Sequence, residues 1–321
     1  MQSVPLDMKI KMTKTRIRDW YEYYGGNVYV SFSGGKDSTV LLHIARELYP
    51  DIPAVFVDTG LEYPEIREFV KTFENVEKLY PEKTFFDVVA EYGYPVISKE
   101  VAKTLYYVRQ GSDWAIKRLN GLDKKGMPNK FKKRFVKYKP LLDAPFGISA
   151  YCCDVMKKQP AHKYESQTGR KPIVATMAEE SQQRQDAWLR NGCNAFDIDR
   201  PVSHPLSFWT QQDILKYLNA YNVPYCPVYG DIVEQDCQLK FIEDDSERLI
   251  TTGCERTGCM FCMFGIMSDK TPNRFQRLKK THPKIYDYCI GGGEFDENGL
   301  LKPNKQGLGI GRILDFIGID Y

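Results

Sequence analysis

Residues 28–40 read VYVSFSGGKDSTV, a run of strand-forming residues that ends at two glycines, a lysine, an aspartate and two hydroxyl side chains. The strand pattern covers residues 27–33, and apolar residues return at helical spacing over residues 38–48. Glycines between a strand and a helix let backbone N–H groups approach an anion closely, and the helix adds the positive end of its dipole. The stretch therefore predicts an anion-binding loop rather than an ordinary tight turn.

The sequence around this loop alternates strand and helix patterns. Further strands are expected at residues 54–58 and 172–178, with a helix near residues 64–73 and a strand–helix pair within residues 76–103. This alternation predicts an α/β fold in which a parallel twisted sheet carries helices on both faces. Ligands bind to such sheets beyond the carboxyl ends of the strands, where the glycine loop falls.

Two domains are expected from the change in sequence texture. Residues 1–205 carry the alternating pattern, and residues 206–321 form a smaller, irregular region in which glycines, prolines and cysteines predominate. The helix expected at residues 208–221 is the clearest periodic element of that second region. No run approaches eighteen apolar residues, so no membrane span is expected. The first residues lack the apolar core of a secretory signal, so we expect a cytoplasmic protein.

The net charge of +3 conceals a strongly basic segment at residues 109–139. This segment holds eleven Lys or Arg against two Asp, and it interleaves them with Trp114, Phe131, Phe135 and Tyr138. Cations neutralise phosphates and aromatic rings stack on bases, so the pattern predicts a contact with nucleic acid, either tRNA or DNA. The alternative is a solvated, flexible insertion without a partner.

Five of the nine cysteines occur in two groups that predict a metal site. Cys152 and Cys153 are adjacent, and Cys254, Cys259 and Cys262 lie within nine residues on a glycine-rich stretch. Cysteines of a cytosolic protein are better read as metal ligands than as disulfides. No histidine lies near the motif, and an all-thiolate site suits either an iron–sulfur cluster or a four-cysteine Zn²⁺ site.

The string SGGKDS resembles the pyrophosphate-binding loop of the PP-loop ATP pyrophosphatase superfamily, also called adenine nucleotide alpha-hydrolases. Members of that superfamily cleave ATP between its α and β phosphates, so the resemblance implies an adenine nucleotide with Mg²⁺. Asp58-Thr59-Gly60, followed by Tyr63-Pro64-Glu65, resembles the branch of sulfonucleotide reductases, including phosphoadenylyl-sulfate (PAPS) reductase-like proteins. Ile66 departs from that branch, in which a threonine is usual.

The cysteine groups extend the same resemblance to a cluster-bearing branch. The string from Tyr151 to Lys157, with Pro160, is similar to the CCxxRK motif of adenylyl-sulfate reductases, although Met156 replaces the arginine. Residues 178–184 and 203–206 are similar to two further segments of that family. The resemblance implies a [4Fe–4S] cluster, with Zn²⁺ as the alternative.

The relatives imply two different sets of cluster ligands. The reductase pattern uses Cys152, Cys153, Cys259 and Cys262. Relatives from DNA phosphorothioation systems have one upstream cysteine and a downstream triplet, which corresponds to Cys152, Cys254, Cys259 and Cys262. The presence of Cys254 favours the second set, with Cys153 as an alternative or additional ligand.

The resemblance also implies the residues of the nucleotide site. Catalytic roles fall to residues that neutralise the phosphates or hold the metal, namely Lys36, Asp37 and Arg184. The expected nucleotide contacts are Ser33, Gly34, Gly35, Lys36, Asp37, Ser38, Asp58, Thr59 and Lys157.

The expected function follows from a missing motif. Sulfonucleotide reductases attack sulfate with a cysteine in a C-terminal ECG-type motif, and no cysteine follows Cys289 here. We therefore expect an ATP-dependent enzyme that adenylates a substrate, releasing pyrophosphate, for sulfur transfer or nucleic-acid modification. A cysteine desulfurase is an expected class of sulfur donor, and self-association is left open. The alternatives are an adenylyl-sulfate or phosphoadenylyl-sulfate reductase, and a non-catalytic, nucleotide-dependent subunit of a DNA modification or defence system.

Overall fold

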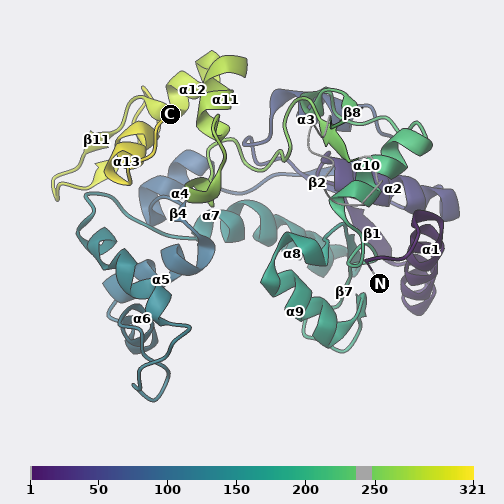
Figure 1. The fold of residues 1–321 in the computed structure, drawn as a ribbon, viewed down its shortest axis with the longest axis horizontal. Helices are drawn as coiled ribbons and strands as arrows, with labels where there is room; N and C mark the ends of the chain where they lie inside the picture. The colour runs from purple at the N-terminus through teal and green to yellow at the C-terminus, as the bar shows by residue number, and fades with distance from the viewer. Residues whose placement is uncertain (1, 236–247) are drawn as a thin grey trace, which may run out of the picture. The chain divides into compact units, whose positions relative to one another are not determined.

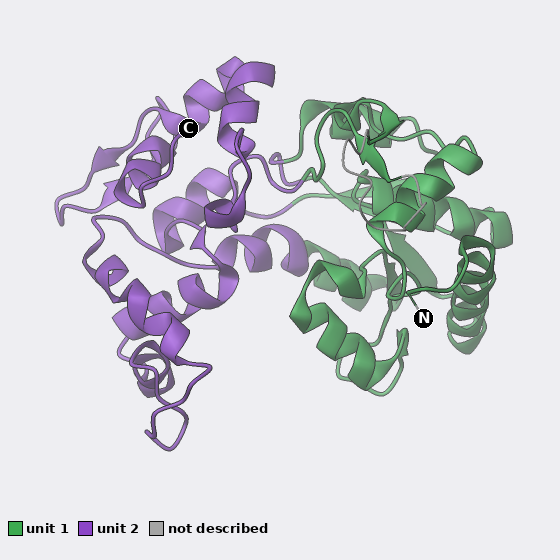
Figure 2. Ribbon diagram, viewed as in Figure 1, with its two compact units in different colours: residues 1–58, 62–80, 160–257 green, residues 59–61, 81–159, 258–321 purple. Residues whose placement is uncertain are grey.

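The structure is a computed structural model that describes residues 2–235 and 248–321. The chain forms two compact units, each assembled from three separate segments (Figure 2). Unit 1 comprises residues 1–58, 62–80 and 160–257, and unit 2 comprises residues 59–61, 81–159 and 258–321. This division does not coincide with the boundary expected at residue 205. Residues 206–235 and 248–257 pack in the unit that holds the glycine loop.

Unit 1 is built on a six-stranded sheet with the order β3-β2-β1-β5-β7-β6. All neighbouring strands are parallel except β6, which pairs antiparallel with β7. The strands are β1 (Val28–Ser31), β2 (Ala54–Val57), β3 (Val76–Leu79), β5 (Lys171–Val174), β6 (Asn194–Ala195) and β7 (Val202–Ser203). Strand β1 is central because its apolar residues are buried on both faces, as parallel sheets require.

Helices cover both faces of this sheet (Figure 1). On one face, Tyr29 of β1 packs on Tyr164 of α8, with Val55 of β2 in the same cluster. Helices α1, α2 and α10 pack against one another on the other face. The helices of unit 1 are α1 (Leu6–Tyr23), α2 (Lys36–Leu48), α3 (Pro64–Lys71), α8 (Gln159–Thr168), α9 (Gln182–Asn191) and α10 (Gln211–Ala220). Shorter elements are η3 (Ala178–Glu180), η4 (Pro227–Tyr229), β8 (Ile232–Glu234) and β9 (Leu249–Thr251).

Unit 2 is mainly helical and holds two small two-stranded sheets. Its helices are α4 (Phe85–Tyr92), α5 (Lys99–Arg109), α6 (Asp113–Leu119), α7 (Tyr151–Cys153), α11 (Arg274–Thr281), α12 (Pro283–Ile290) and α13 (Ile310–Phe316). The remaining elements are β4 (Val96–Ile97), β10 (Met263–Phe264), β11 (Glu294–Phe295), β12 (Leu301–Lys302), η1 (Lys133–Asp143), η2 (Asp154–Lys158) and η5 (Ile266–Ser268). Strand β10 pairs parallel with β4 and so fixes the chain just after the CxxC motif.

The strands and helices expected around the glycine loop are confirmed, with ends shifted by a few residues. The helix expected at residues 208–221 begins instead at Gln211, because Thr210 and Asp213 form a capping box at its start. The region after residue 258 is more helical than its composition predicts, since α11, α12 and α13 pack in sequence. None of the helices in the described ranges is long and apolar enough to cross a membrane.

Candidate functional site

The glycine loop has the shape that an anion site needs. Gly34 has a φ of +70°, and a Cβ there would lie 2.8 Å from Val70 and 2.9 Å from Ile66. The hydroxyl of Ser38 accepts from the Ser33 backbone N–H at 3.1 Å and donates to the Gly35 carbonyl at 2.8 Å. Because these bonds hold the turn closed, the N-terminus of α2 faces the loop with its backbone N–H groups.

Lys36 is held by a segment that sequence reasoning did not identify. Its side chain is only 4% exposed, and its ammonium donates to the main-chain carbonyl of Glu255 at 2.9 Å. Its backbone N–H donates to the hydroxyl of Tyr229 at 3.3 Å, and Thr257 is hydrogen-bonded to that hydroxyl at 3.0 Å. Tyr229 and residues 254–257, which we call the strap, therefore cover the loop within unit 1.

Two arginines add positive charge beside the loop. Arg184 at the start of α9 forms an ion pair with Glu180, and Arg256 of the strap lies 3.7 Å from the same carboxylate. Burial and the neighbouring charge of Arg256 lower the pKa of Arg184, whereas Asp37 acts in the opposite direction. These mutual effects place Arg184 and Arg256 in one electrostatic neighbourhood with the loop. Arg256 was not predicted, because nothing in the CERTGC string marks it as a phosphate ligand.

Asp37 offers an oxygen ligand for a cation. Its Oδ1 is buried and has no hydrogen-bond partner within the described chain, and the ammonium of Lys36 lies 4.0 Å away. Mg²⁺ prefers carboxylate oxygens and usually binds through one or two of them together with phosphates. The unsatisfied oxygen at this position therefore fits a magnesium ion that accompanies a phosphate.

Asp58 and Thr59 occupy the end of β2 but differ in their surroundings. The carboxylate of Asp58 is buried and accepts from Arg67 of α3 at 2.9 and 3.0 Å. The hydroxyl of Thr59 accepts from the backbone N–H of Leu61 at 3.2 Å, within unit 2. Asp58 is thus fixed in place by Arg67, a partner that the sequence pattern did not predict.

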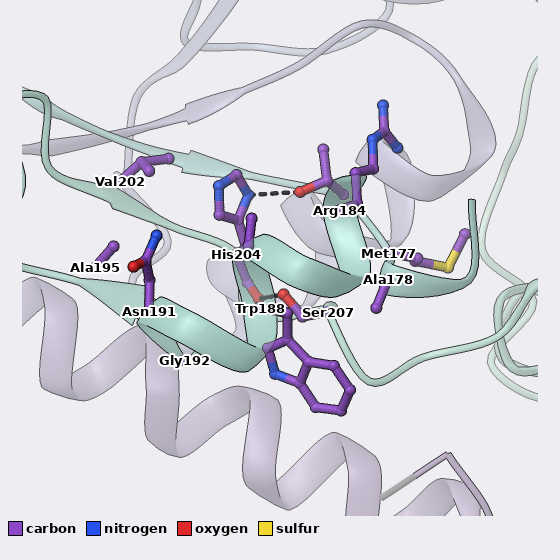
Figure 3. Close-up of a pocket in the computed structure, with 12 residues that line it drawn as sticks. Met177, Ala178, Arg184, Trp188, Asn191, Gly192, Ala195, Val202, His204 and Ser207 are labelled. Atoms are coloured by element: carbon purple, nitrogen blue, oxygen red, sulfur yellow. Dashed lines mark hydrogen bonds between the residues drawn. The ribbon is translucent and has the colours of Figure 1, made fainter. Parts of the chain in front are cut away.

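Beside Arg184, unit 1 contains a cavity of about 220 Å³ at the ends of β5 and β7 (Figure 3). His204 lines it, and its Nδ1 lies 2.5 Å from the hydroxyl of Thr176. Burial and the charge of Arg184 lower the pKa of His204 to about 4, so its imidazole is neutral at physiological pH. Trp188 and Met177 supply most of the aromatic and sulfur surface of the wall.

Four of the five grouped cysteines belong to unit 2. Cys152 and Cys153 lie on α7, and the hydrogen bond between their thiols, followed by burial, strongly raises the pKa of Cys152. The charges of Cys259 and Cys262 add to this effect, which places all four thiols in one neighbourhood. Burial and the charge of Cys259 raise the pKa of Cys262 to about 11.

The remaining cysteine of the motif, Cys254, belongs to unit 1. It lies on the strap, where its Sγ is 2.8 Å from the carbonyl of Arg256. Within unit 2, the thiols of Cys152, Cys153, Cys259 and Cys262 influence one another electrostatically. The preference for Cys254 as a ligand stays a prediction.

Among Cys152, Cys153 and Cys262, only Cys153 has a lowered thiol pKa. Its hydrogen bond with Cys152, together with the charges of Lys99 and Lys157, lowers its pKa to about 6. Lys157 was expected to contact the nucleotide, and the structure places it in unit 2, where its charge acts on this thiol.

These thiols are suitable donors for a metal, but their side chains are not arranged around a common centre. Four thiolates are the donors that a [4Fe–4S] cluster or a structural Zn²⁺ requires. As the side chains stand, no three Cys, His, Asp or Glu residues of the described chain are grouped tightly enough to hold a metal ion. The thiols would have to turn toward a common centre to bind one.

Comparison with known proteins identifies a matching family. The family model described as phosphoadenosine phosphosulfate reductase domain matches residues 27–87 and 118–264 of the chain. These two ranges include the glycine loop, all five grouped cysteines, Arg184 and the strap. Residues 88–117, which hold β4, α5 and most of α6, lie between the matched ranges.

Individual relatives are distant. The chain is 25% identical over 234 residues to a phosphoadenosine 5'-phosphosulfate reductase of Alkalilimnicola ehrlichii, covering 72% of this chain and 76% of that protein. It is 26% identical over 241 residues to sulfate adenylyltransferase subunit 2 of Proteus mirabilis, covering 68% and 67%. A crystal structure of phosphoadenylyl-sulfate reductase from Candida auris matches 69% of this chain and 88% of that one, with 13% identity and a TM-score of 0.37.

Proposed function

Because the chain belongs to the phosphoadenosine phosphosulfate reductase domain family, we propose that it is an enzyme that binds an adenine nucleotide at the glycine loop and acts on the bond beside its α phosphate. The observation that carries this proposal is the convergence of Lys36, Arg184 and Arg256 around the loop of unit 1. Three cations and the N-terminus of α2 match a polyanion better than they match a neutral ligand.

Reduction of a sulfonucleotide is the first candidate reaction, because relatives with that name support it. In this reaction a thiolate attacks the sulfur of the sulfate, the sulfur–oxygen bond to the phosphate breaks, and AMP or its 3'-phosphate leaves. The enzyme then carries an S-sulfonate. A dithiol protein attacks that sulfur–sulfur bond, releases sulfite and ends as a disulfide. Cys254 is the partly exposed thiol of the strap beside the loop, so we assign it the attacking role.

Adenylation by ATP is the second candidate, and the burial of three further thiols in the described part of the chain favours it. Burial raises the pKa of Cys193, of Cys226 to about 11, and of Cys289, so these thiols are poor nucleophiles. In this reaction an acceptor oxygen attacks the α phosphorus and pyrophosphate leaves, with Lys36, Arg184 and Arg256 neutralising its charge. The relative named sulfate adenylyltransferase subunit 2 supports ATP as the nucleotide. A donor such as a cysteine desulfurase would then supply sulfur to the activated acceptor.

Two inorganic groups belong to the proposal. Asp37 would hold Mg²⁺ through its unsatisfied oxygen and so would help to orient the phosphates. Cys152, Cys153, Cys259 and Cys262 would hold a [4Fe–4S] cluster, or Zn²⁺ in its place. When bound, a cluster would supply a redox centre in unit 2.

Two assays on the same anaerobic preparation test the proposal. The first measures sulfite from adenylyl sulfate and phosphoadenylyl sulfate with a thioredoxin-class reductant, and the second measures pyrophosphate from ATP with a panel of acceptors. Sulfite that disappears in Cys254→Ser supports reduction, and pyrophosphate release that survives this substitution supports adenylation. Lys36→Ala should abolish either activity. If neither nucleotide class binds to the purified chain in calorimetry, the proposal is wrong.

A further inference from the structure

Some of the cations in the basic segment at residues 109–139 stabilise the fold, and others are exposed to solvent. Arg109 is structural, because its guanidinium donates to the main-chain carbonyls of Phe146, Leu141, Leu142 and Ala144 at 2.7–3.3 Å. Arg118 lies over the ring of Phe135 and pairs with Glu100 at 3.5 Å. These arginines hold the segment to α5 rather than offering charge to a ligand.

The aromatic residues of the segment also divide, into one that is buried in the fold and others that are exposed. Phe135 is 1% exposed and anchors η1, so the expectation that it stacks on a base is wrong. Phe131 is 81% exposed, and Trp114 is 41% exposed. A single exposed apolar side chain is common on a protein surface and does not by itself indicate a partner. The Phe131 ring gains its interest from the exposed lysines on either side of it in the sequence, Lys130 and Lys133. Phe131 is thus the aromatic side chain most available for stacking.

The remaining charge is carried by lysines that have no acidic partner within the described residues. Lys124, Lys125, Lys130, Lys133, Lys137 and Lys139 are all exposed, and none forms an ion pair there. The two acidic residues within the segment already have partners: Asp113 pairs with Lys117, and Asp123 accepts from the backbone N–H groups of residues 125 and 127. Six unpaired cations within sixteen residues are costly in the free protein and favour an anionic partner.

Four of these lysines, Lys124, Lys125, Lys130 and Lys133, lie on two ordered turns. The first is a tight hairpin in which Leu122 pairs with Pro128, and it carries Lys124 and Lys125 at its tip. In the second, the side chain of Asn129 accepts from the backbone N–H groups of residues 131 and 132. Figure 1 shows this part of the chain projecting from unit 2 beyond α6. Ordered turns lose less conformational entropy on binding than a flexible insertion would.

We propose that the hairpin at residues 122–128 and the turn at residues 129–133 bind single-stranded nucleic acid, with the lysines on phosphates and Phe131 stacked on a base. Projecting cations with an exposed ring suit a single strand, whose bases are unstacked and reachable. The surface belongs to unit 2 and the glycine loop to unit 1, and this proposal does not depend on the proposed reaction. If adenylation is the reaction, this surface also implies that the acceptor is a nucleic acid.

Fluorescence anisotropy of the full chain with labelled 20-nucleotide oligo-U and oligo-dT tests this surface. Phe131→Ala should weaken binding about fivefold or more, as expected for loss of one stacked base. The triple variant Lys124→Ala, Lys130→Ala, Lys133→Ala should lower the slope of log Kd against log salt by about 2, since each phosphate contact on a single strand contributes about 0.7.

A matched control removes equal charge from the same unit. Lys270, Lys280 and Lys284 are also exposed, and the triple alanine variant at these positions should leave binding and the salt slope unchanged. If both triple variants weakened nucleic-acid binding equally, net charge alone would explain the loss, and the proposal would be overturned. Binding to phosphatidylserine vesicles without binding to either oligonucleotide would also overturn it. Nucleotide turnover with small substrates is measured in parallel. This measurement distinguishes an error in the proposed reaction from an error in the proposed nucleic-acid surface.

Discussion

At the scale of single residues, the nucleotide loop depends on side chains that lie far from it in sequence. Lys36 is predictable from the SGGKDS string, but Tyr229, Glu255 and Arg256 are not, since each is more than 190 residues away. A strand-to-helix motif defines its own backbone, whereas the groups that cover it come from tertiary packing. The sequence could therefore predict the cradle but not the strap.

Arg256 tests this view of the loop. Its side chain is 55% exposed, so Arg256→Ala should change the free energy of unfolding by less than about 0.5 kcal/mol. Loss of a charged hydrogen bond to phosphate should nevertheless weaken nucleotide binding by about tenfold or more. Calorimetric titration with the adenine nucleotide measures this loss. Arg190→Ala, on the exposed side of α9, serves as the control, and an equal loss there would contradict a specific role for Arg256.

His204 predicts a dependence of stability on pH. Burial lowers its folded pKa to about 4, below the 6.5 of the unfolded chain, so the unfolded state binds more protons between these values. The stabilisation is fully present above pH 6.5 and decreases as pH falls toward 4, by roughly 3 kcal/mol over this range. Urea unfolding at several pH values measures it. His204→Gln should flatten the slope, whereas His162→Gln, at an exposed position, should leave it unchanged.

At the scale of elements, the basic segment shows where residue patterns mislead. Charges and rings alternate along residues 109–139, and the pattern does not distinguish Phe135 from Phe131. The distinction arises because η1 turns Phe135 inward under the guanidinium groups of Arg118 and Arg134. The sequence pattern succeeds for β1 because its run of strand formers is buried on both faces, and for α2 because its apolar run is buried along most of the helix. A 3₁₀ segment offers no comparable signal.

The two phenylalanines form a matched pair for a stability test. Phe135→Ala removes a ring that is 1% exposed and should destabilise the fold by about 3–5 kcal/mol. Phe131→Ala removes a ring that is 81% exposed and should stay within about 0.5 kcal/mol of the parent. Chemical denaturation followed by circular dichroism compares them. Similar losses for both variants would show that Phe131 is also part of the packing.

At the scale of the whole molecule, the chain crosses between its units several times. After unit 2 has begun, residues 160–235 and 248–257 belong again to unit 1, and residues 258–321 complete unit 2. Amino-acid composition changes gradually over this range and does not indicate where the chain passes from one unit to the other. The thiol grouping depends on them, because Cys152 and Cys262 are brought into one unit from segments 110 residues apart.

The division of the cysteines between units predicts which substitutions remove a metal. Serine at Cys152, Cys153, Cys259 or Cys262 should abolish bound iron and sulfide, whereas Cys254→Ser should retain them. Elemental analysis of anaerobically purified protein provides the measurement. Loss in Cys254→Ser with retention in Cys153→Ser would assign the ligands to the other set. Zinc without sulfide in the parent protein would exclude the cluster.

The bond between the ammonium of Lys36 and the carbonyl of Glu255 has a kinetic consequence. In the free protein the ammonium of Lys36 is already hydrogen-bonded to a main-chain carbonyl. An incoming phosphate must therefore displace this oxygen instead of entering an open site. Only the fraction of molecules with the strap displaced is competent to bind, and the apparent affinity falls by that fraction. The observed association rate should then rise with nucleotide concentration to a plateau, which equals the rate at which the strap opens.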